Sequence, residues 1–245
     1  MSGNWIILGA SSAMARAFAR SLAVDGAALA LCGRDEADLG RDAADLLLRG
    51  AADALVLRYD SRDPDCEAAI LSHAQDRPGP VNVAVFAGSM PPQTAVEEYP
   101  HLLDGVVTDN FTSAARLLLK LAPLMEARGA GTIVGVSSVA GDRGRLKNYA
   151  YGAAKAGFQV FLAGLRNRLG RSGVHVLTVK PGFVDTAMTW GLEGMFLVAS
   201  PQDVARDIRR AVERKRNVIY TPIFWTLIMT IIRLIPERIF KKLQI

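Results

Sequence analysis

The sequence predicts an α/β fold: a doubly wound parallel sheet of about seven strands, followed by an amphipathic helical tail at the C-terminus. Two observations predict the sheet. Short apolar runs of strand length alternate with longer segments of helical periodicity. Several of these runs are apolar on both faces, as parallel strands between two helical layers are. Such alternation builds right-handed βαβ units in a single sheet.

The individual elements follow from the short apolar runs and from the segments of helical periodicity. Strands are expected at 5–8, 28–32, 54–59, 81–86, 132–137, 175–180 and 217–220. Helices are expected at 12–25, 35–49, 65–74, 102–127, 149–172 and 201–214. Doubly wound sheets bind ligands outside the carboxyl ends of their strands, where the winding reverses. We therefore look for functional residues at strand ends and helix starts.

Length and composition predict one domain, 1–220, with the tail at 221–245. The chain has 245 residues, of which half are hydrophobic, and it contains no internal repeat. Cys32 and Cys66 lie in different units, which argues against a disulfide scaffold and a metal site and fits a reducing compartment. The chain starts with a strand and lacks the pattern of a secretory signal, so a cytoplasmic location is expected.

The stretch "LGASSAMA", 8–15, forms the first turn between strand and helix. Dinucleotide-binding proteins place glycines in such a turn, but here Gly9 is the single glycine, and Ala13 and Ala15 stand where two more are expected. The turn alone does not distinguish a nucleotide site from an ordinary strand–turn–helix.

The segment "SSVAGDRGRLKNYAYGAAKAGF", 137–158, carries the clearest chemistry. Tyr151 and Lys155 are four residues apart and share one face of a helix. A nearby ammonium is expected to lower the phenol pKa from about 10, so that the phenol exchanges a proton near neutral pH. The alternative is an amphipathic helix with a surface Lys155 and a half-buried Tyr151.

Three further features add to the pair formed by Tyr151 and Lys155. Ser138 lies thirteen residues before Tyr151, Asn110 lies in an earlier long helix, and "KPGFVDT" (180–186) follows the next strand. With Lys155 and this Pro-Gly turn, the pattern resembles the short-chain dehydrogenase/reductase family over nearly the whole chain. The resemblance implies a Rossmann-like fold, an NAD(P)-dependent oxidoreductase, and a catalytic tetrad of Asn110, Ser138, Tyr151 and Lys155.

The same resemblance implies the cofactor site. Its expected residues are Gly9, Ser11, Ser12, Ala13, Met14, Arg34, Asp60, Ala87, Gly88, Tyr151, Lys155, Pro181, Gly182, Val184 and Thr186. Ala13 departs from the family pattern, because its methyl lies where the backbone approaches the pyrophosphate. Ser11 and Ser12 are expected to compensate at the helix N-terminus, where an anion is favoured. Phe86 also departs, since the family usually has asparagine there.

The end of the second strand bears on the choice of cofactor. Gly33 stands where NAD-preferring members carry an acid, and Arg34 follows, placed to meet a 2′-phosphate. NADP(H) is therefore expected, with NAD(H) possible. The alternative is a solvated Arg34 at a helix start, with Asp35 as the N-cap.

The C-terminal segment concentrates the positive charge. Residues 206–245 contain ten Lys/Arg and three Asp/Glu, a net charge of +7 against +5 for the whole chain. This charge adjoins the apolar "FWTLIMTIIRLIPERIFKKLQI" (224–245), which favours an anionic membrane surface over nucleic acid. As a helix, 223–235 reaches about 20 Å, short of a ~30 Å bilayer core. We expect an in-plane anchor with four residues at the headgroup boundary: Trp225, Arg238, Lys241 and Lys242. A lid or a dimer interface is the alternative.

The tail and segment 137–157 resemble one subgroup of the family, the decaprenylphosphoryl-2-keto-pentose reductases. That resemblance implies a ketone on a polyprenyl-phosphate sugar and a peripheral position on the inner face of the cytoplasmic membrane. The loop between Ser138 and Tyr151 contains three residues that are then expected beside the substrate: Arg143, Arg145 and Asn148. The two arginine guanidiniums would hold a phosphate, and the alternative is a solvated basic loop. Reduction of 3-oxoacyl or other apolar ketones, and NADP binding without turnover, stay open. A homo-oligomer is expected.

Overall fold

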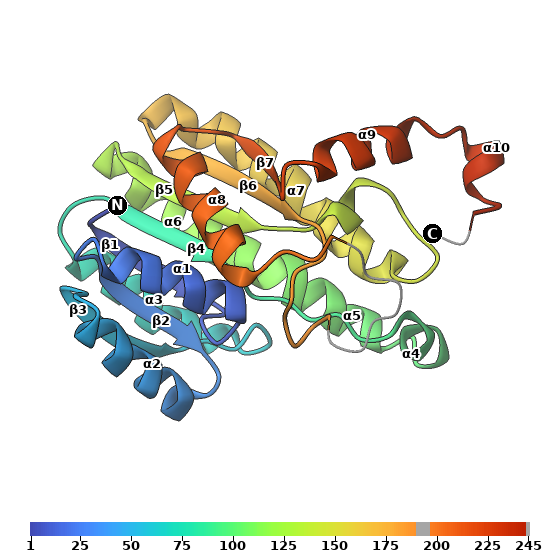
Figure 1. Cartoon of the computed structure of the whole chain (residues 1–245). Coiled ribbons are helices and arrows are strands. Elements are labelled where there is room, and N and C mark those ends of the chain that lie inside the picture. The colour runs from blue at the N-terminus through green and yellow to red at the C-terminus, as the bar shows by residue number, and fades with distance from the viewer. Residues whose placement is uncertain (190–196, 244–245) are drawn as a thin grey trace.

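The computed structural model describes residues 1–189 and 197–243, and these form one sheet of seven parallel strands in the order β3-β2-β1-β4-β5-β6-β7 (Figure 1). The strands are β1 (Asn4–Leu8), β2 (Ala28–Gly33), β3 (Asp53–Arg58), β4 (Val81–Val85), β5 (Gly131–Val136), β6 (His175–Pro181) and β7 (Val218–Thr221). Every strand end lies within one residue of its predicted place. The predicted doubly wound fold is confirmed.

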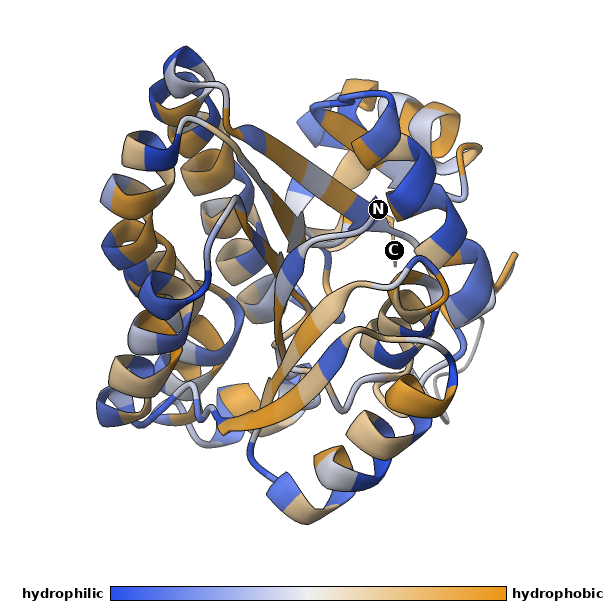
Figure 2. Cartoon of the chain, turned by 90° about the vertical axis from the view of Figure 1, so that its left-hand side faces the viewer, coloured by the Kyte–Doolittle hydropathy of each residue, from blue (hydrophilic) through white to orange (hydrophobic). Residues whose placement is uncertain are grey.

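Helices cover both faces of the sheet, and in Figure 2 their outer sides are hydrophilic. One layer contains α1 (Ala13–Ala23), α2 (Glu36–Leu48) and α8 (Pro201–Glu213); the other contains α3 (Glu67–Asp76), α6 (Ser113–Arg128) and α7 (Tyr149–Leu169). In β1, Trp5 and Ile7 enter the first core, and Ile6 and Leu8 enter the second. This alternation explains why the strand is apolar at every position from Trp5 to Leu8.

The predicted helix 102–127 is interrupted in the structure. It consists of α5 (Leu102–Val107), one π-helical turn (Thr108–Thr112) and α6. Asn110 lies in the π turn, and such turns are frequent at functional sites. A further short helix, α4 (Gln93–Glu98), was not predicted; the Gln93 side-chain oxygen accepts a hydrogen bond from Ala150 N (3.0 Å) at the start of α7.

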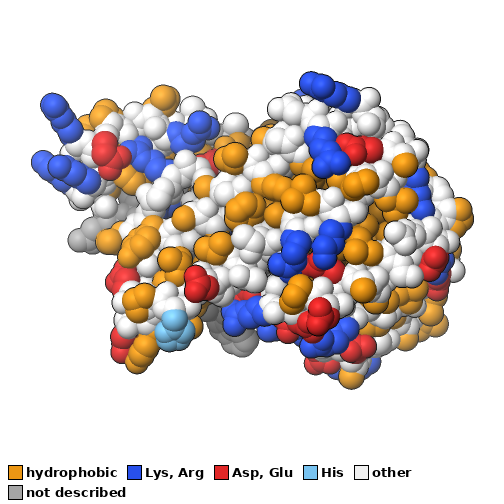
Figure 3. Space-filling view, turned by 180° about the vertical axis from the view of Figure 1, so that it is seen from behind, with side chains coloured by type: hydrophobic (Ala, Val, Ile, Leu, Met, Phe, Trp, Pro, Cys, Tyr) orange, Lys and Arg blue, Asp and Glu red, His pale blue; other side chains and the backbone are white. Residues whose placement is uncertain are grey.

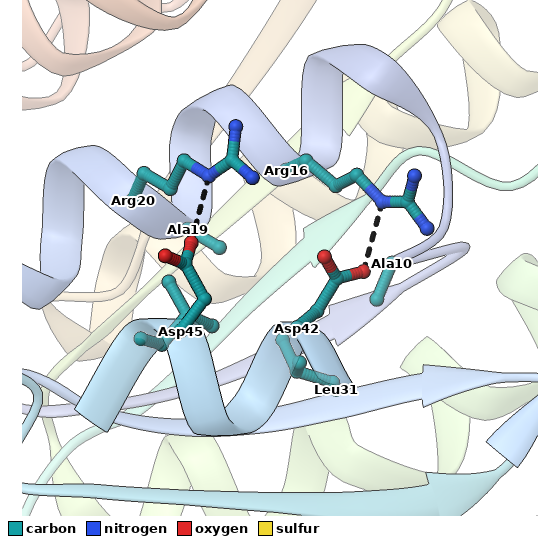
Figure 4. A pocket seen from close by; sticks show the side chains of 8 residues that line it. Ala10, Arg16, Ala19, Arg20, Leu31, Asp42 and Asp45 are labelled. Atoms are coloured by element: carbon teal, nitrogen blue, oxygen red, sulfur yellow. Dashed lines mark hydrogen bonds and ion pairs between the residues drawn. The ribbon is translucent and has the colours of Figure 1, made fainter. Parts of the chain in front are cut away.

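Three ion pairs join α1 to α2, of which Figure 4 draws two. Arg16 binds Asp42 at 2.8 Å, and Arg20 binds Asp45 at 3.1 Å. The crevice beneath them measures about 10 Å³, roughly the space of one water molecule. It is therefore a packing defect between helices, and its ion pairs fix the helix that follows β2.

The tail folds back onto the domain through α9 (Trp225–Leu234) and continues into α10 (Glu237–Phe240). Trp225 and Met229 are buried against Val139. The expectation that Trp225 lies at a headgroup boundary is therefore wrong, because its indole belongs to the protein core. Among the helices of the described segments, none is both long and apolar enough to cross a bilayer.

Candidate active site

A cleft of about 750 Å³ opens at the carboxyl ends of β1 and β4, where the winding of the sheet reverses. Nine of the predicted cofactor residues line it: Gly9, Ser11, Ser12, Ala13, Met14, Arg34, Ala87, Gly88 and Thr186. Sequence reasoning missed others, among them Arg16, Tyr59, Ser61, Arg62, Met188 and Gln202. Tyr59, Ser61 and Arg62 directly follow the end of β3, so the strand-end rule would have found them.

The first turn is held by a close backbone approach. Gly9 has φ +74°, and a Cβ at this position would lie 2.6 Å from Ala87 N. Both the torsion and the contact require glycine. The Ser12 hydroxyl accepts a hydrogen bond from Ala15 N (3.2 Å) and caps α1. The N-terminus of α1 therefore faces the cleft, with its partial positive charge toward any anion bound there.

Arg34 and Asp35, directly after β2, have different roles: Asp35 caps α2, and Arg34 lines the cleft. The Asp35 carboxylate accepts from Asp38 N (2.9 Å) and caps α2, as its place in the sequence indicated. Arg34 is exposed, lines the cleft, and forms no ion pair with a described residue. The Arg34 guanidinium is thus available to an anionic ligand, whereas Arg16 is already paired with Asp38 and Asp42.

Asp60 lies beside the cleft rather than in its lining. Its carboxylate accepts from Arg62 N (3.0 Å) within the turn after β3. The Arg62 guanidinium binds Asp109 at 2.9 Å, and Asp109 also accepts from Ser89 Oγ (2.7 Å). These contacts join the turn after β3 to the π turn that contains Asn110.

The four residues of the predicted tetrad come from three elements. Ser138 lies two residues after the end of β5 and precedes the 3₁₀ turn Val139–Asp142, and Tyr151 and Lys155 lie on successive turns of α7. Tyr151 is 9% exposed, Lys155 4% and Asn110 2%. The alternative of a surface lysine beside a half-buried tyrosine is therefore wrong.

Lys155 and Asn110 meet beside Gly88. Lys155 Nζ donates to Val136 O (3.2 Å), and Asn110 Nδ2 donates to Ser89 O (2.7 Å) and Val106 O (2.9 Å). Asn110 Oδ1 is buried and has no hydrogen-bond partner among the described residues. A Cβ on Gly88 would lie 2.5 Å from Asn110 Oδ1 and 3.3 Å from Lys155 Nζ. An unsatisfied acceptor beside an ammonium fits a hydroxyl-bearing ligand or a water at this end of the cleft.

Burial dominates the electrostatics of Tyr151 and Lys155. It raises the Tyr151 pKa to about 12, although the Ser138 hydroxyl and the Arg145 charge oppose the rise. Burial also lowers the Lys155 pKa to about 8. The prediction that Lys155 brings the phenol pKa below its ordinary value is therefore wrong for the protein alone. Removing the phenolate from water raises the pKa by more than the neighbouring groups lower it.

The structure separates the two arginines of the loop before α7. Arg143 donates to Ile235 O (2.7 Å) and pairs with Glu237 at 2.9 Å, so the tail occupies its guanidinium. Arg145 Nε is buried without a hydrogen-bond partner among the described residues, and burial lowers the Arg145 pKa. The Asn148 side-chain oxygen is buried and equally unsatisfied within the described part of the chain.

The segment after β6 reaches the cleft only in part. Pro181 ends β6, and Gly182 N donates to Thr221 O (3.0 Å) in β7. Val184 is buried and bridges to Ala199. Thr186 lines the cleft, and its N–H donates to Thr189 Oγ1 (3.2 Å). Of the four predicted cofactor residues here, Thr186 is the one in the lining.

The lowered pKa of Lys155 makes a prediction about stability. Between pH 8 and 10.5 the unfolded chain binds a proton at Lys155 that the folded chain has lost, so the free energy of unfolding rises with pH over this range. Urea unfolding is measured at pH 7.5 and 9.5 without added cofactor. The free energy of unfolding of the wild type minus that of Lys155→Met should be about 1–3 kcal/mol higher at pH 9.5 than at pH 7.5. A difference that does not change with pH would contradict the burial of this ammonium.

Comparisons with known proteins agree with this geometry. The chain is 32% identical over 241 residues to an uncharacterized oxidoreductase of Mycobacterium tuberculosis, covering 97% of this chain and 96% of that one. It is 28% identical to the ketoacyl reductase HetN of a Nostoc species, covering 89% and 78%. Among solved structures, a short-chain dehydrogenase from Sphingobium yanoikuyae in complex with NADPH superposes with a TM-score of 0.81, at 25% identity and 97% coverage of both chains.

The family model for short chain dehydrogenases matches residues 4–195, a range that contains all four residues of the predicted tetrad and most of the residues that line the cleft. This oxidoreductase therefore belongs to the short chain dehydrogenase family.

Proposed function

We propose that this oxidoreductase reduces a ketone to a secondary alcohol with NADPH. The observation that carries the proposal is the convergence of Ser138, Tyr151, Lys155 and Asn110, three of them buried. These four residues do not line the cleft themselves, but Lys155 and Asn110 adjoin Gly88, which lines it together with Arg34. NADPH, when bound, supplies a hydride to the carbonyl carbon. The chain's own residues then have to hold the carbonyl oxygen and provide one proton.

Tyr151 is the proton donor in this proposal, and Ser138 holds the carbonyl oxygen. A phenol whose pKa is about 12 is protonated at neutral pH, which is the form that reduction requires. The Ser138 hydroxyl and the Arg145 guanidinium both favour the phenolate that remains after the transfer. Lys155 and Asn110, beside Gly88, would bind the ribose and hold a water that returns the proton.

Arg34 is the basis for preferring NADPH over NADH. Its unpaired guanidinium lines the cleft directly after β2, where Gly33 leaves no acid to hold a ribose hydroxyl. The NADPH complex of the structurally similar Sphingobium enzyme supports the same cofactor. Residues that hold a 2′-phosphate do so with charge-assisted hydrogen bonds, and an arginine with no protein partner suits this task.

The substrate that we propose is a ketone on a polyprenyl-phosphate sugar. Arg145 supports an anionic group near the ketone, because its buried Nε has no hydrogen-bond partner among the described residues and is costly unless a ligand completes it. The tail supports a lipid, since α9 packs against the turn that follows Ser138. Reduction of 3-oxoacyl groups is the second candidate, which the similarity to a ketoacyl reductase favours.

We also propose that the enzyme works at an anionic membrane surface. Trp225 and Met229 anchor α9 to the domain, and the opposite side carries four aliphatic side chains that are 55–81% exposed: Ile223, Leu227, Ile231 and Leu234. Arg238, Lys241 and Lys242 are exposed in and directly after α10, the next helix of the tail. An apolar stripe next to basic side chains is typical of peripheral membrane binding.

A second copy of this chain is the partner that we expect at the face formed by α6 and α7. Apolar side chains gather on the side of the molecule away from α1 and α8 (Figure 3). A hollow of about 470 Å³ lies there, lined by Phe111, Leu119 and Phe161 among others. An exposed apolar face of this kind favours a homodimer.

The reaction is tested by Tyr151→Phe, which removes the proton donor and keeps the ring. We expect kcat to fall by about 10²–10⁴-fold while the NADPH dissociation constant stays nearly unchanged. Turnover is measured with polyprenyl-phosphate keto-sugars and with 3-oxoacyl thioesters, which separates the two substrate candidates. Tyr149→Phe, an exposed neighbour on α7, is the matched control. More than a tenth of kcat left in Tyr151→Phe would refute the assignment, and no turnover by wild type would favour NADP binding without catalysis.

Cofactor choice is tested by Arg34→Ala. The variant loses a charge-assisted bond worth about 1.5–3 kcal/mol, so its affinity for NADPH should fall about ten-fold or more and its affinity for NADH should not. Fluorescence titration with both cofactors measures the two affinities. Arg41→Ala, which removes an exposed arginine of α2, is the control. Equal losses for NADPH and NADH would assign Arg34 to structure alone.

Membrane binding is tested on the exposed side of α9. Replacing Leu227 and Ile231 with serine removes apolar side chains worth about 1.5–3 kcal/mol each when buried, so co-sedimentation with anionic vesicles should weaken ten-fold or more. Val160→Ser, equally exposed on α7, should bind as wild type does. Binding should also fall with salt, since the basic side chains contribute about 1 kcal/mol each. Failure of wild type to bind anionic vesicles at low salt would remove the membrane from the proposal.

A further inference from the structure

The tail contacts both chain segments that form the substrate end of the proposed site. Trp225 and Met229 pack on Val139, the residue after Ser138. The Trp225 ring also meets Phe183, the residue after Gly182, edge to face with 5.5 Å between ring centroids. Helix α9 therefore touches the continuation of β5 and the continuation of β6 together.

Trp225 sets the course of the Pro181–Gly182 turn. A Cβ placed on Gly182 would overlap the indole ring, so the Gly182 backbone lies directly on Trp225. On its other side, Gly182 N donates to Thr221 O (3.0 Å) at the end of β7. Glycine is needed here for this close approach, and the turn is held between the last strand and the first residue of α9.

Arg143 fastens the opposite end of α9. Its guanidinium donates to the carbonyls of Ile232 and Ile235, pairs with Glu237 (2.9 Å), and stacks 3.6 Å from the Phe240 ring centroid. The last carbonyls of a helix have no partners within the helix and carry its negative end, so a cation is favoured there. Because Arg143 lies five residues after Ser138, this clasp joins the tail to the segment that carries the proposed catalytic serine.

Asp142, next to Arg143, joins the ends of β6 and β7. Its carboxylate is 2% exposed and accepts from Lys180 Nζ (2.6 Å) at the end of β6 and from Tyr220 Oη (2.6 Å) in β7. A buried carboxylate with a cation and a hydroxyl as partners has little freedom to move. The position of Trp225 relative to β6 is therefore fixed at both ends of α9.

We propose that Trp225 is a positioning residue for the nicotinamide half of the cofactor, acting through the Gly182 backbone, with Arg143 holding α9 in place. The inference rests on the proposed function: hydride transfer to a carbonyl held by Ser138 and Tyr151 requires the nicotinamide beside them, and Trp225 joins the Pro181–Gly182 turn to the segment that follows Ser138. The adenosine half lies at the other end of the cleft, beside Arg34, and does not depend on the tail. Trp225 thus affects one half of the ligand.

The test compares NADPH with 2′,5′-ADP, which carries the adenosine half alone. In Trp225→Leu and in Arg143→Gln, we expect the dissociation constant of 2′,5′-ADP to stay within about two-fold of wild type. NADPH should bind about ten-fold more weakly, and kcat should fall by about ten- to a hundred-fold, because small displacements of reacting groups are costly. Met229→Leu, a volume-conserving change in the same cluster, should leave all three quantities close to wild type.

A thermodynamic cycle tests the contact without any turnover. Gly182→Ala should lower the unfolding temperature, because the added methyl overlaps the indole. The decrease in unfolding temperature should be smaller when Gly182→Ala is combined with Trp225→Leu. Additive effects would show that Trp225 does not set the turn and would overturn the inference.

The binding data can also overturn it. Equal losses of NADPH and 2′,5′-ADP affinity in Trp225→Leu would make the residue a general stabiliser of the fold, and wild-type values for both ligands and for kcat would give it no role. If wild type binds NADPH but reduces no ketone, the proposed reaction fails, and the two affinities still decide the role of Trp225. If wild type binds neither ligand, both proposals fail.

Discussion

The buried carboxylate of Asp142 is the interaction on which the substrate end of this molecule depends. It joins Lys180 of β6 to Tyr220 of β7, and it lies between Ser138 and Arg143 in the chain. Removing a carboxylate from water is costly unless its partners are fixed, so the ends of three strands and the base of the tail adopt one arrangement. The same corner presents Ser138 to Tyr151 and the tail to the Pro181–Gly182 turn.

A different constraint governs the cofactor end. The turn after β1 passes so close to Ala87 that only glycine fits at position 9, and this approach brings the N-terminus of α1 to the ends of β2 and β4. Ion pairs between α1 and α2 then hold the segment that begins with Arg34. The proposed site therefore has an adenosine end built from helix starts and, next to the cleft, a reaction end built from buried polar side chains.

Burial at the reaction end has a chemical consequence. Tyr151 and Lys155 lie within the protein, and both are shifted toward their neutral forms. A neutral phenol is the proton donor that ketone reduction requires, and the Ser138 hydroxyl and then the Arg145 charge favour the anion formed afterwards. Asn110, held by two backbone carbonyls in a π turn, keeps one acceptor without a partner among the described residues beside this pair.

The sequence by itself determined the sheet and the location of the predicted tetrad. Strand positions follow from short runs of consecutive apolar residues, and the spacing of Ser138, Tyr151 and Lys155 places them at one strand end and on one helix face. These features depend on local periodicity, which the order of residues contains. Gly9 belongs with them, since its positive φ is a property of a single turn.

Only the tertiary structure decided which face of the tail is buried, which arginine is occupied, and the direction of the Tyr151 pKa shift. A helix with apolar residues on most sides, such as α9, does not reveal from its order which side meets the domain, so Trp225 was predicted at a membrane and lies in the core. Arg143 and Arg145 are two residues apart, yet α9 and α10 take the first and leave the second. Burial of Tyr151 arises from segments distant in the chain, and desolvation acts through such contacts rather than through sequence neighbours.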